Sequence, residues 1–485
     1  MANNRNLELC CLNRYRPASW PPFRLGECLR KSTPDLSSFL VFELLHTKQY
    51  RLLTRFVCRL VVPSINPVNC SLFCIIHPHR CNDSHNLTVA TVIQNYMCLS
   101  VLVTNAQSKQ TLAIVRGLSN FGYDIITVGA HPRSQSFYSK HCLAGIQVAD
   151  SETNPRRFTA DVNKAVQDYN IDVVLPVSSS DTMAIARYRE EFGDRVQIPI
   201  ADYEILVAAF DKELTFDHAR EQDIPIPETY CPTDRAELED LADDLSYPVV
   251  VKLRQTSASE GLRYAHSRDE LLSVYELDGP DGVSTEYERP LVQEYIEGDI
   301  HDVCVLFQDG ELKRALTQKR LRMYPASGGG GVVNVTTDRP ELIELAEDLL
   351  STLDYHGVAQ VEFMIEEGTG DPYLIEVNPK LWGTSGLSIA AGVNFPKYLV
   401  EVSQGKTLER NLSDYEVGLT YVWLSPGLLG NVEQSDGVVE ALIDIRRVHA
   451  SNGQTDLDFS DPIPHLVRMP QIAWIVFRSL FSRLS

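Results

Sequence analysis

The regular alternation of strand-like and helix-like segments between residues 97 and 200 limits the fold of this chain more than any other feature. Buried strand-like runs alternate with segments of helical periodicity, at 101–104, 109–121, 124–128, 156–169, 172–176 and 182–192. This order predicts a parallel sheet with right-handed crossovers, and therefore an α/β domain. The first turn, residues 104–110, reads TNAQSKQ. Because it lacks the G-x-G-x-x-G pattern, a dinucleotide site has little support.

The pattern changes to an α+β one between residues 201 and about 405. Helices are expected at 203–222, 235–244 and 340–353, and strands at 248–253, 291–296, 301–307, 312–319, 358–365 and 372–378. The glycine run 327–331 indicates a mobile loop. We therefore expect one domain at 97–200 and a second at 201–405 with a lid at about 248–297. An appendage at 406–485 would end in a short apolar helix at 472–484, packed on its own domain or a partner subunit. Docking of this helix on a membrane surface is the alternative.

Residues 1–96 differ from the rest because they show no clear strand or helix period. We expect them to be an upstream stretch translated from an incorrectly assigned start, with Met97 as the natural one, or a disordered arm. A small zinc module is the alternative, since cysteine and histidine clusters can bind Zn²⁺. The cluster consists of Cys70, Cys74, His77, His79, Cys81 and His85. Its spacing fits no zinc-finger pattern.

The formal net charge of −21 is unevenly distributed along the chain. Residues 1–96 contain 11 basic and 5 acidic residues, and the remainder contains 33 basic and 60 acidic residues. An acidic body of this kind repels nucleic acid and anionic membranes, so we expect no nucleic-acid partner. The acidic excess also suits a high-salt cytoplasm, where hydrated carboxylates keep a protein surface in solution.

Cysteine usage and apolar runs indicate a cytoplasmic protein. Seven of the 11 cysteines fall within residues 1–96 and the other four are isolated, so no disulfide framework is expected. No apolar run reaches transmembrane length, and no signal-peptide pattern opens the chain.

Two acidic residues face each other in the hairpin expected at residues 358–378. With the turn centred near Thr369, Glu362 lies directly opposite Glu376, and Asn378 shares their face. The opposite, core-facing side is expected to carry Val361, Phe363, Ile375 and Val377.

Facing carboxylates destabilise a sheet, so their charge must be compensated. Mg²⁺ prefers oxygen ligands and binds through one or two carboxylates plus substrate phosphates, which fits these three side chains. A buried proton and a solvent-facing hairpin with incidental acids are the alternatives.

Further motifs occur in an order that resembles the ATP-grasp superfamily, which includes biotin carboxylase, D-alanine–D-alanine ligase and the carbamoyl-phosphate synthetase large subunit. The resemblance covers about residues 98–405. It rests on Asp211-Lys212-Glu213, Val249–Lys252 with the loop Thr256–Gly261, Val292–Gly298, and Glu376–Thr384, which resembles the family's E-x-N-P-R segment. Lys380 replaces the family's arginine and loses its bidentate geometry.

The resemblance implies an ATP- and Mg²⁺-binding site. Lys212 and Lys252 would neutralise phosphate oxygens, and the small-residue loop would fold over them. Glu362, Glu376 and Asn378 would hold Mg²⁺, and Mn²⁺ suits the same oxygen ligands. The implied nucleotide contacts are Lys212, Lys252, Thr256, Ser257, Ser259, Gly261, Gln293, Glu294, Tyr295, Ile296 and Asp302. Among them, Glu294 and Ile296 would bind adenine through their backbones and Asp302 would bind the ribose.

A cation should face the transferring phosphoryl group, and Arg320 suits this role because guanidinium matches planar phosphoryl oxygens. Lys380 would be a second phosphate contact. Arg322 would share the face of Arg320 and hold the substrate carboxylate. Ser178 and Asp181 follow the end of a parallel strand, where ligands bind in α/β sheets. The glycine run would act as a lid that excludes water.

The fold implied by the resemblance is a parallel-sheet α/β domain followed by a two-subdomain α+β ATP-grasp fold with a lid, and the implied function is that of a ligase. It would join a small-molecule carboxylate to an amine through an acyl phosphate, using ATP and Mg²⁺ and releasing ADP and phosphate. An ATP-binding regulatory or scaffold protein and a small-molecule kinase are the alternatives. The residues do not identify the carboxylate or the amine, and they leave a homo-oligomer open.

Overall fold

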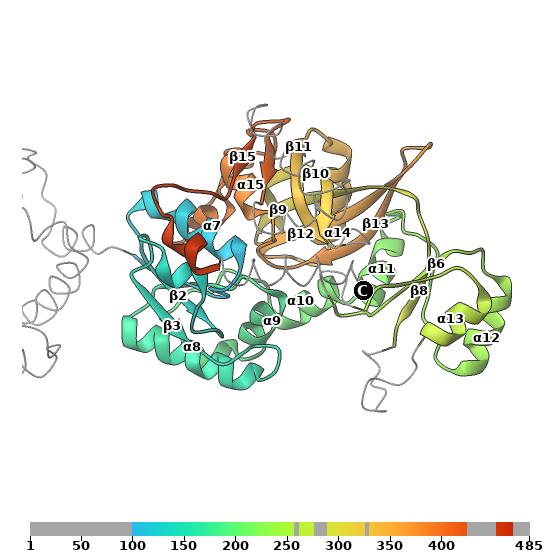
Figure 1. The fold of residues 1–485 in the computed structure, drawn as a ribbon, viewed down its shortest axis with the longest axis horizontal. Helices are drawn as coiled ribbons and strands as arrows, with labels where there is room; N and C mark the ends of the chain where they lie inside the picture. Colours follow the sequence, from blue (N-terminus) through green and yellow to red (C-terminus); the bar gives the residue numbers. More distant parts are fainter. Residues whose placement is uncertain (1–98, 257–260, 276–288, 325–328, 424–452, 469–485) are drawn as a thin grey trace, which may run out of the picture. The chain divides into compact units, whose positions relative to one another are not determined.

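The computed structural model describes residues 99–256, 261–275, 289–324, 329–423 and 453–468 (Figure 1). Residues 97–485 form one compact unit. The cysteine and histidine cluster of 70–85, Ser257, Ser259 and the expected helix at 472–484 lie outside the described residues. Among the helices that are described, none combines the length and apolar character needed to cross a bilayer.

The first sheet is parallel, with the strand order β3-β2-β1-β4. Its strands are β1 (Ser100–Val103), β2 (Asp124–Gly129), β3 (Ala144–Gln147) and β4 (Val173–Leu175). Its helices are α7 (Lys109–Leu118), α8 (Pro155–Tyr169) and α9 (Ser179–Arg187), with short 3-10 turns η2 (Ser119–Phe121), η3 (Gln135–Tyr138) and η4 (Arg189–Phe192). The parallel sheet expected from the alternation is confirmed. Strand β3 was not predicted because its four residues do not form a continuous apolar stretch, and they alternate between partly buried and exposed.

The single helix expected at 203–222 is wrong, because the chain breaks at Asp211. Helix α10 (Tyr203–Phe210) ends there and α11 (Lys212–Glu221) begins. Asp211 has extended backbone angles, and its carboxylate accepts hydrogen bonds from the N–H groups of Glu213 and Leu214. Aspartate is among the preferred N-cap residues for this reason. The break leaves Lys212 at the first position of α11, where it is buried.

The largest sheet has seven strands in the order β13-β12-β9-β10-β11-β14-β15. They are β9 (Gly298–Gln308), β10 (Glu311–Tyr324), β11 (Gly330–Thr337), β12 (Gly357–Glu366), β13 (Pro372–Asn378), β14 (Thr420–Val422) and β15 (Gln454–Thr455). All neighbours pair antiparallel except β14 and β15. Helix α14 (Pro340–Ser351) packs Leu342, Ala346 and Leu349 into the apolar cluster on one face of this sheet.

A smaller antiparallel sheet of order β5-β8-β6-β7 carries the region expected to be the lid. Its strands are β5 (Thr229–Tyr230), β6 (Val249–Lys252), β7 (Arg263–Ala265) and β8 (Leu291–Glu294). Helices α12 (Arg235–Asp244) and α13 (Arg268–Val274) pack against it through Leu238 and Leu271, in an apolar cluster of its own. This region therefore has its own small core.

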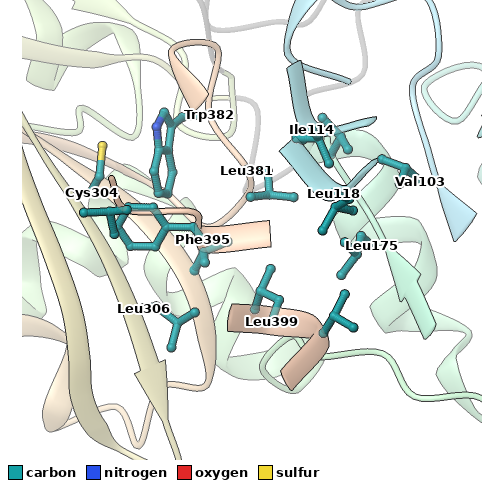
Figure 2. Packing of buried hydrophobic residues seen from close by; sticks show 14 of the residues in the cluster. Val103, Ile114, Leu118, Leu175, Cys304, Leu306, Leu381, Trp382, Phe395 and Leu399 are labelled. Atoms are coloured by element: carbon teal, nitrogen blue, oxygen red, sulfur yellow. The ribbon is translucent and has the colours of Figure 1, made fainter. Parts of the chain in front are cut away.

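One apolar cluster joins the first sheet to the seven-stranded sheet (Figure 2). Helices α15 (Ser385–Ala390) and α16 (Phe395–Ser403) contribute to it. Figure 2 shows Leu118 and Leu175 of the first domain on one side, with Trp382, Phe395 and Leu306 on the other. Because Leu306 and Cys304 belong to β9, the first domain covers the apolar end of one sheet face.

The glycine run and the expected appendage both contribute strands to the large sheet. Gly330 and Gly331 begin β11 and pair with Tyr324 and Met323, so this part of the run is a strand rather than a loop. Residues 327 and 328 lie outside the described residues. Further on, β14 pairs with β11, and the adjoining Trp423 is fully buried.

Candidate functional site

The two acids of the hairpin lie opposite each other, as the sequence predicts. Glu362 of β12 pairs directly with Glu376 of β13, and Gln360 pairs with Asn378. The Asn378 amide donates to Glu362 Oε1 at 3.0 Å and to Glu376 Oε1 at 2.8 Å. One amide therefore lies between the two carboxylates and holds all three side chains on one face.

The core-facing side of the hairpin needs one correction. A bulge between Glu362 and Phe363 shifts the register, so Phe363 pairs with Leu374. Leu374 is fully buried in the core, whereas Ile375 is only partly buried and takes no part in that cluster. The prediction that Ile375 points into the core is wrong, because the bulge inserts one extra residue before Glu376.

Each carboxylate of the hairpin is paired with a cationic side chain. Arg320 Nη2 lies 2.5 Å from Glu362 Oε1, and Lys212 Nζ lies 3.2 Å from Glu376 Oε2. The mutual repulsion is thus offset by protein cations already. Any bound metal would add to this compensation.

Asp302 is a partner of Arg320, and its contact with a ribose stays a prediction. The sequence predicts a ribose contact, whereas Asp302 is fully buried and accepts from Arg320 Nη2 at 2.6 Å and from Gln318 Nε2 at 2.7 Å. It stands in the middle of the sheet, opposite Glu362 on the neighbouring strand β12. Its carboxylate therefore positions the guanidinium.

The two predicted phosphate lysines lie on the same side of the hairpin. Lys212 Nζ donates to the carbonyl of Thr256 at 2.7 Å, and Lys252 Nζ donates to the carbonyl of Ile375 at 3.3 Å. Both lysines are buried, and Lys252 also lies over the ring of Phe216. Burial lowers the pKa of Lys252 to about 7, and the charge of Lys212 acts in the same direction.

Burial acts differently on the two facing acids because their neighbours differ. Burial raises the pKa of Glu362 to about 8, against the opposing charge of Arg320. Burial would also raise the pKa of Glu376, but Lys212, Asn378 and Lys252 outweigh it and lower this pKa to about 2. The pair therefore offers one firmly ionised carboxylate and one that, even beside Arg320, holds its proton more tightly than an ordinary glutamate.

Lys380 adjoins the same acids. Its backbone N–H donates to the carbonyl of Asn378 at 2.8 Å. Burial lowers the pKa of its ammonium, and the charges of Glu376 and Glu362 oppose that shift. Its side chain is partly buried.

The predicted nucleotide contacts between Gln293 and Ile296 lie at the end of β8 and directly after it. Gln293 is buried, and its Nε2 donates to Thr229 Oγ1 at 2.7 Å. The N–H of Glu294 donates to the carbonyl of Glu228, and Ile296 is buried. Tyr295 is 40% exposed and stacks edge-on against Tyr264.

The loop after β6 is described only at its ends. The carbonyl of Thr256 meets Lys212, as above, and Gly261 has a φ of +71°. A side chain at Gly261 would be strained there and would approach Leu253.

Arg322 does not share the face of Arg320, contrary to prediction. A bulge lies between them, so that Arg320 pairs with Asn334 but Arg322 pairs with Val333. Paired residues share a face, and Val333 and Asn334 are consecutive, so the two arginines project from opposite faces.

The residues at the end of the first sheet are engaged in local structure. Ser178 caps α9 by accepting from the N–H of Asp181. Asp181 is buried, and its carboxylate accepts from Thr104 Oγ1 at 2.5 Å and from Ser151 Oγ at 2.6 Å. These bonds tie the loops after β1, β3 and β4 together. A substrate contact by either residue stays a prediction.

A second buried ion cluster was absent from the sequence predictions. Arg254 bonds Asp211 at 2.9 Å and Glu213 at 2.5 Å, and Gln255 Nε2 donates to Asp211 Oδ2 at 2.9 Å. The acidic residues on either side of Lys212 are the sequence feature that could have indicated this cluster. The cluster fixes the start of α11 and hence the position of Lys212.

The donor set fits Mg²⁺. Glu362, Glu376 and Asn378 bring two carboxylates and a side-chain amide within hydrogen-bonding distance of one another, and hard divalent cations take oxygen ligands of this kind. Sulfur-preferring metals have no ligand among these three side chains.

Residues 209–384 match the family model described as an ATP-grasp domain. The carbamoyl phosphate synthase large chain of Methanothermobacter thermautotrophicus is 23% identical over 272 residues, which are 52% of this chain and 25% of that protein. The carbamoyl-phosphate synthase of Methanobrevibacter smithii is 25% identical over 259 residues, 50% of this chain and 67% of that protein. This chain spans about a quarter of the length of the first relative.

Two solved structures share the fold. Campylobacter jejuni biotin carboxylase has a TM-score of 0.56 and 16% identity, covering 66% of this chain and 74% of that one. The biotin carboxylase domain of Hydrogenobacter thermophilus 2-oxoglutarate carboxylase, in complex with MgADP, ADP and bicarbonate, has a TM-score of 0.54 and 16% identity, covering 66% and 73%. At this identity the likeness establishes the fold alone: a parallel-sheet first domain followed by a two-subdomain region with a lid.

Proposed function

Starting from a chain whose residues 209–384 form an ATP-grasp domain, we propose that this protein is an ATP- and Mg²⁺-dependent ligase. It joins a small-molecule carboxylate to an amine through an acyl phosphate and releases ADP and phosphate. The relatives named above are synthases and carboxylases, which supports ligase chemistry in general. The particular reaction rests on the residues of this chain.

The observation that carries the proposal is the position of Arg320. Its guanidinium bridges Asp302 and Glu362, directly beside the facing acids of the hairpin. Two buried carboxylates hold it in one orientation, and its side chain is only 8% exposed, which limits competition from water. A fixed guanidinium next to a magnesium site can stabilise charge on a transferring phosphoryl group.

The remaining residues divide between nucleotide and metal. Lys212 and Lys252 neutralise phosphate oxygens, and the backbones of Glu294 and Ile296 meet the adenine. Glu362, Glu376 and Asn378 would hold Mg²⁺, which would supply positive charge beside the transferring phosphate. Lys380 supplies a further positive charge beside these acids.

The reaction proceeds in two steps. An oxygen of the substrate carboxylate attacks the γ-phosphorus, and the bond between this phosphorus and the bridging oxygen breaks, so that ADP leaves. The amine nitrogen then attacks the acyl carbon, the bond to the phosphate oxygen breaks, and the amine loses a proton. The protein positions both reactants and stabilises charge, without a covalent intermediate of its own.

The test follows ADP and inorganic phosphate from the full chain, incubated with ATP, Mg²⁺ and pools of carboxylates and amines at low and high salt. Substrate-dependent release of ADP and phosphate in equal amounts is expected. ADP without free phosphate would instead indicate a kinase, and AMP would refute the acyl phosphate. Tight ATP binding without turnover would favour a regulatory protein, for which the replacement of arginine by Lys380 is the one supporting feature.

A further inference from the structure

The polar face of the large sheet continues beyond Arg320 toward β11 and β14. Arg320 pairs with Asn334 of β11, and Asn334 pairs with Tyr421 of β14, so all three project from the same face. Asn334 is fully buried. Among the described residues, neither its Oδ1 nor its Nδ2 has a hydrogen-bond partner. A buried amide left unpaired on both atoms is unfavourable by itself, which points to a missing partner.

The side chain of Lys109, from helix α7 of the first domain, also lies beside Asn334. Its Nζ donates to the carbonyl of Gly331 at 3.4 Å and lies 4.6 Å from the ring centroid of Trp423. The Asn334 amide lies directly against Gly331, since a Cβ added there would come within 2.1 Å of Asn334 Oδ1. Lys109 and Asn334 thus meet across one glycine that has no room for a side chain.

The segment 453–468 packs beside the region around Lys109. It is fastened to α7 and to the chain beside η3, because Asp461 accepts from Arg116 Nε at 3.1 Å and from Ser139 Oγ at 2.7 Å. From this segment Arg468 donates to Gln135 Oε1 at 3.4 Å. The Nε2 of the buried Gln135 has no partner within the described part of the chain.

Two cationic side chains lie near Asn334 in addition to Arg320. Burial lowers the pKa of Lys109 to about 7, Asp456 opposes this shift, and Arg468 and Arg320 add to it. Arg320 is already paired with Asp302 and Glu362, so Lys109 and Arg468 are the cations that a bound carboxylate would meet, with Asp456 as the acid near them.

We propose that the substrate carboxylate of the ligase binds between Arg320 and Lys109, with the Asn334 amide as its hydrogen-bonding partner. This inference rests on the proposed function and names where its acyl donor lies. The position borders the guanidinium that faces the phosphoryl group, so the carboxylate oxygen is within reach of its target. Arg468 and the Gln135 amide that it bonds define the far end, where Gln135 Nε2 is without a partner among the described residues, and this suits a carboxylic acid carrying a second polar or anionic group.

The turnover experiment compares Lys109→Met with Lys164→Met, an exposed lysine on α8. Losing a buried charge-assisted hydrogen bond should raise the KM for the carboxylate about 10- to 100-fold, with the KM for ATP unchanged. Lys109→Arg should restore part of the loss, and Lys164→Met should match the parent chain. A rise confined to the KM for the amine would overturn the assignment.

A binding experiment separates this inference from the proposed function. The full chain, saturated with Mg²⁺ and a non-hydrolysable ATP analogue, is titrated calorimetrically with acetate, malonate and glutarate, and with their neutral amides. Carboxylates should bind, amides should not, and Lys109→Met and Asn334→Leu should each weaken binding about tenfold or more.

Carboxylate binding at Lys109 without any ADP production would refute the ligase and keep the anion site. Equal binding by parent and Lys109→Met, or binding of the amides as tightly as the acids, would refute the site.

Discussion

Two ends of one sheet face differ in how their polar groups are satisfied. At the β12–β13 end, Asn378 bonds both acids, and Arg320 bonds Glu362 and Asp302. At the β11–β14 end, the buried Asn334 amide is unpaired among the described residues, and so is Trp423 Nε1. Asn334 and Trp423 are fully buried, whereas Glu376 at the paired end is partly exposed, so contact with water does not take the place of the missing bonds.

This difference in hydrogen bonding distinguishes residues that stabilise the site from residues whose polar groups are available to a ligand. A buried charged network is costly to break once it has formed, because each partner left behind is an unpaired charge. An unpaired buried amide lowers stability in the free protein and recovers its bonds only when a ligand arrives. We therefore expect opposite responses of stability to mutation at the two ends.

The largest effect on stability is expected at the paired end. Arg320→Met leaves Asp302 and Glu362 buried without a cation, and the free energy of unfolding should fall by about 3–5 kcal/mol. Urea denaturation of the full chain measures this. Lys319→Met is the control, because Lys319 neighbours Arg320 on the same strand but pairs with the exposed Asp299, and it should change stability by less than about 1 kcal/mol. Equal losses of stability in the two variants would contradict the claim that Arg320 stabilises the fold by pairing with two buried carboxylates.

The metal ligands should affect turnover more than folding. Glu376→Gln keeps the shape of the side chain but removes the firmly ionised carboxylate, and ADP release should fall about 100-fold or more. Glu367→Gln changes an exposed acid in the turn of the same hairpin and should leave the rate unchanged. A Glu376→Gln variant with full activity would refute the metal assignment.

ATP affinity should depend on pH through Lys252. Its pKa of about 7 in the free protein means that the ammonium loses its proton above pH 7. Binding a triphosphate at higher pH then requires proton uptake, so affinity should fall roughly tenfold between pH 7 and 8.5. Lys252→Arg, charged throughout, should bind with the same affinity at both values, as followed by equilibrium dialysis. The account of Lys252 fails if the parent chain shows no such decrease.

The smallest effect, and one of opposite sign, is expected at the unpaired end. Asn334→Leu replaces an unsatisfied amide by an apolar group of similar shape, so the free energy of unfolding should stay constant or rise by about 1 kcal/mol. Asn378→Leu at the paired end should lower it by about 2 kcal/mol. Thermal unfolding of both variants gives the comparison, and a similar loss in both would mean that the two ends do not differ.

The local part of the site could be predicted from the sequence. The facing of Glu362 and Glu376 follows from the symmetry of the hairpin about its turn, and the parallel first sheet follows from its alternation. The bulges before Phe363 and around Arg322 could not be predicted, because no glycine or other signal marks them.

Contacts between segments that are distant in the chain could not be predicted from the sequence. The pairing of Asp302 with Arg320 depends on β9 lying between β10 and β12, and the sequence does not state that order. The position of Lys109 depends on the first domain packing against the large sheet, so its spacing within α7 gave no sign of a role.

The fate of one oxygen atom tests the acyl phosphate most directly. Once a carboxylate substrate is found, it is prepared with ¹⁸O in its carboxyl group, and the inorganic phosphate released in a single turnover of the full chain is analysed by mass spectrometry. The account predicts one ¹⁸O in each phosphate, because the carboxylate oxygen that attacks the γ-phosphorus leaves with it. Phosphate without ¹⁸O, formed together with the amide product, would contradict the proposed mechanism.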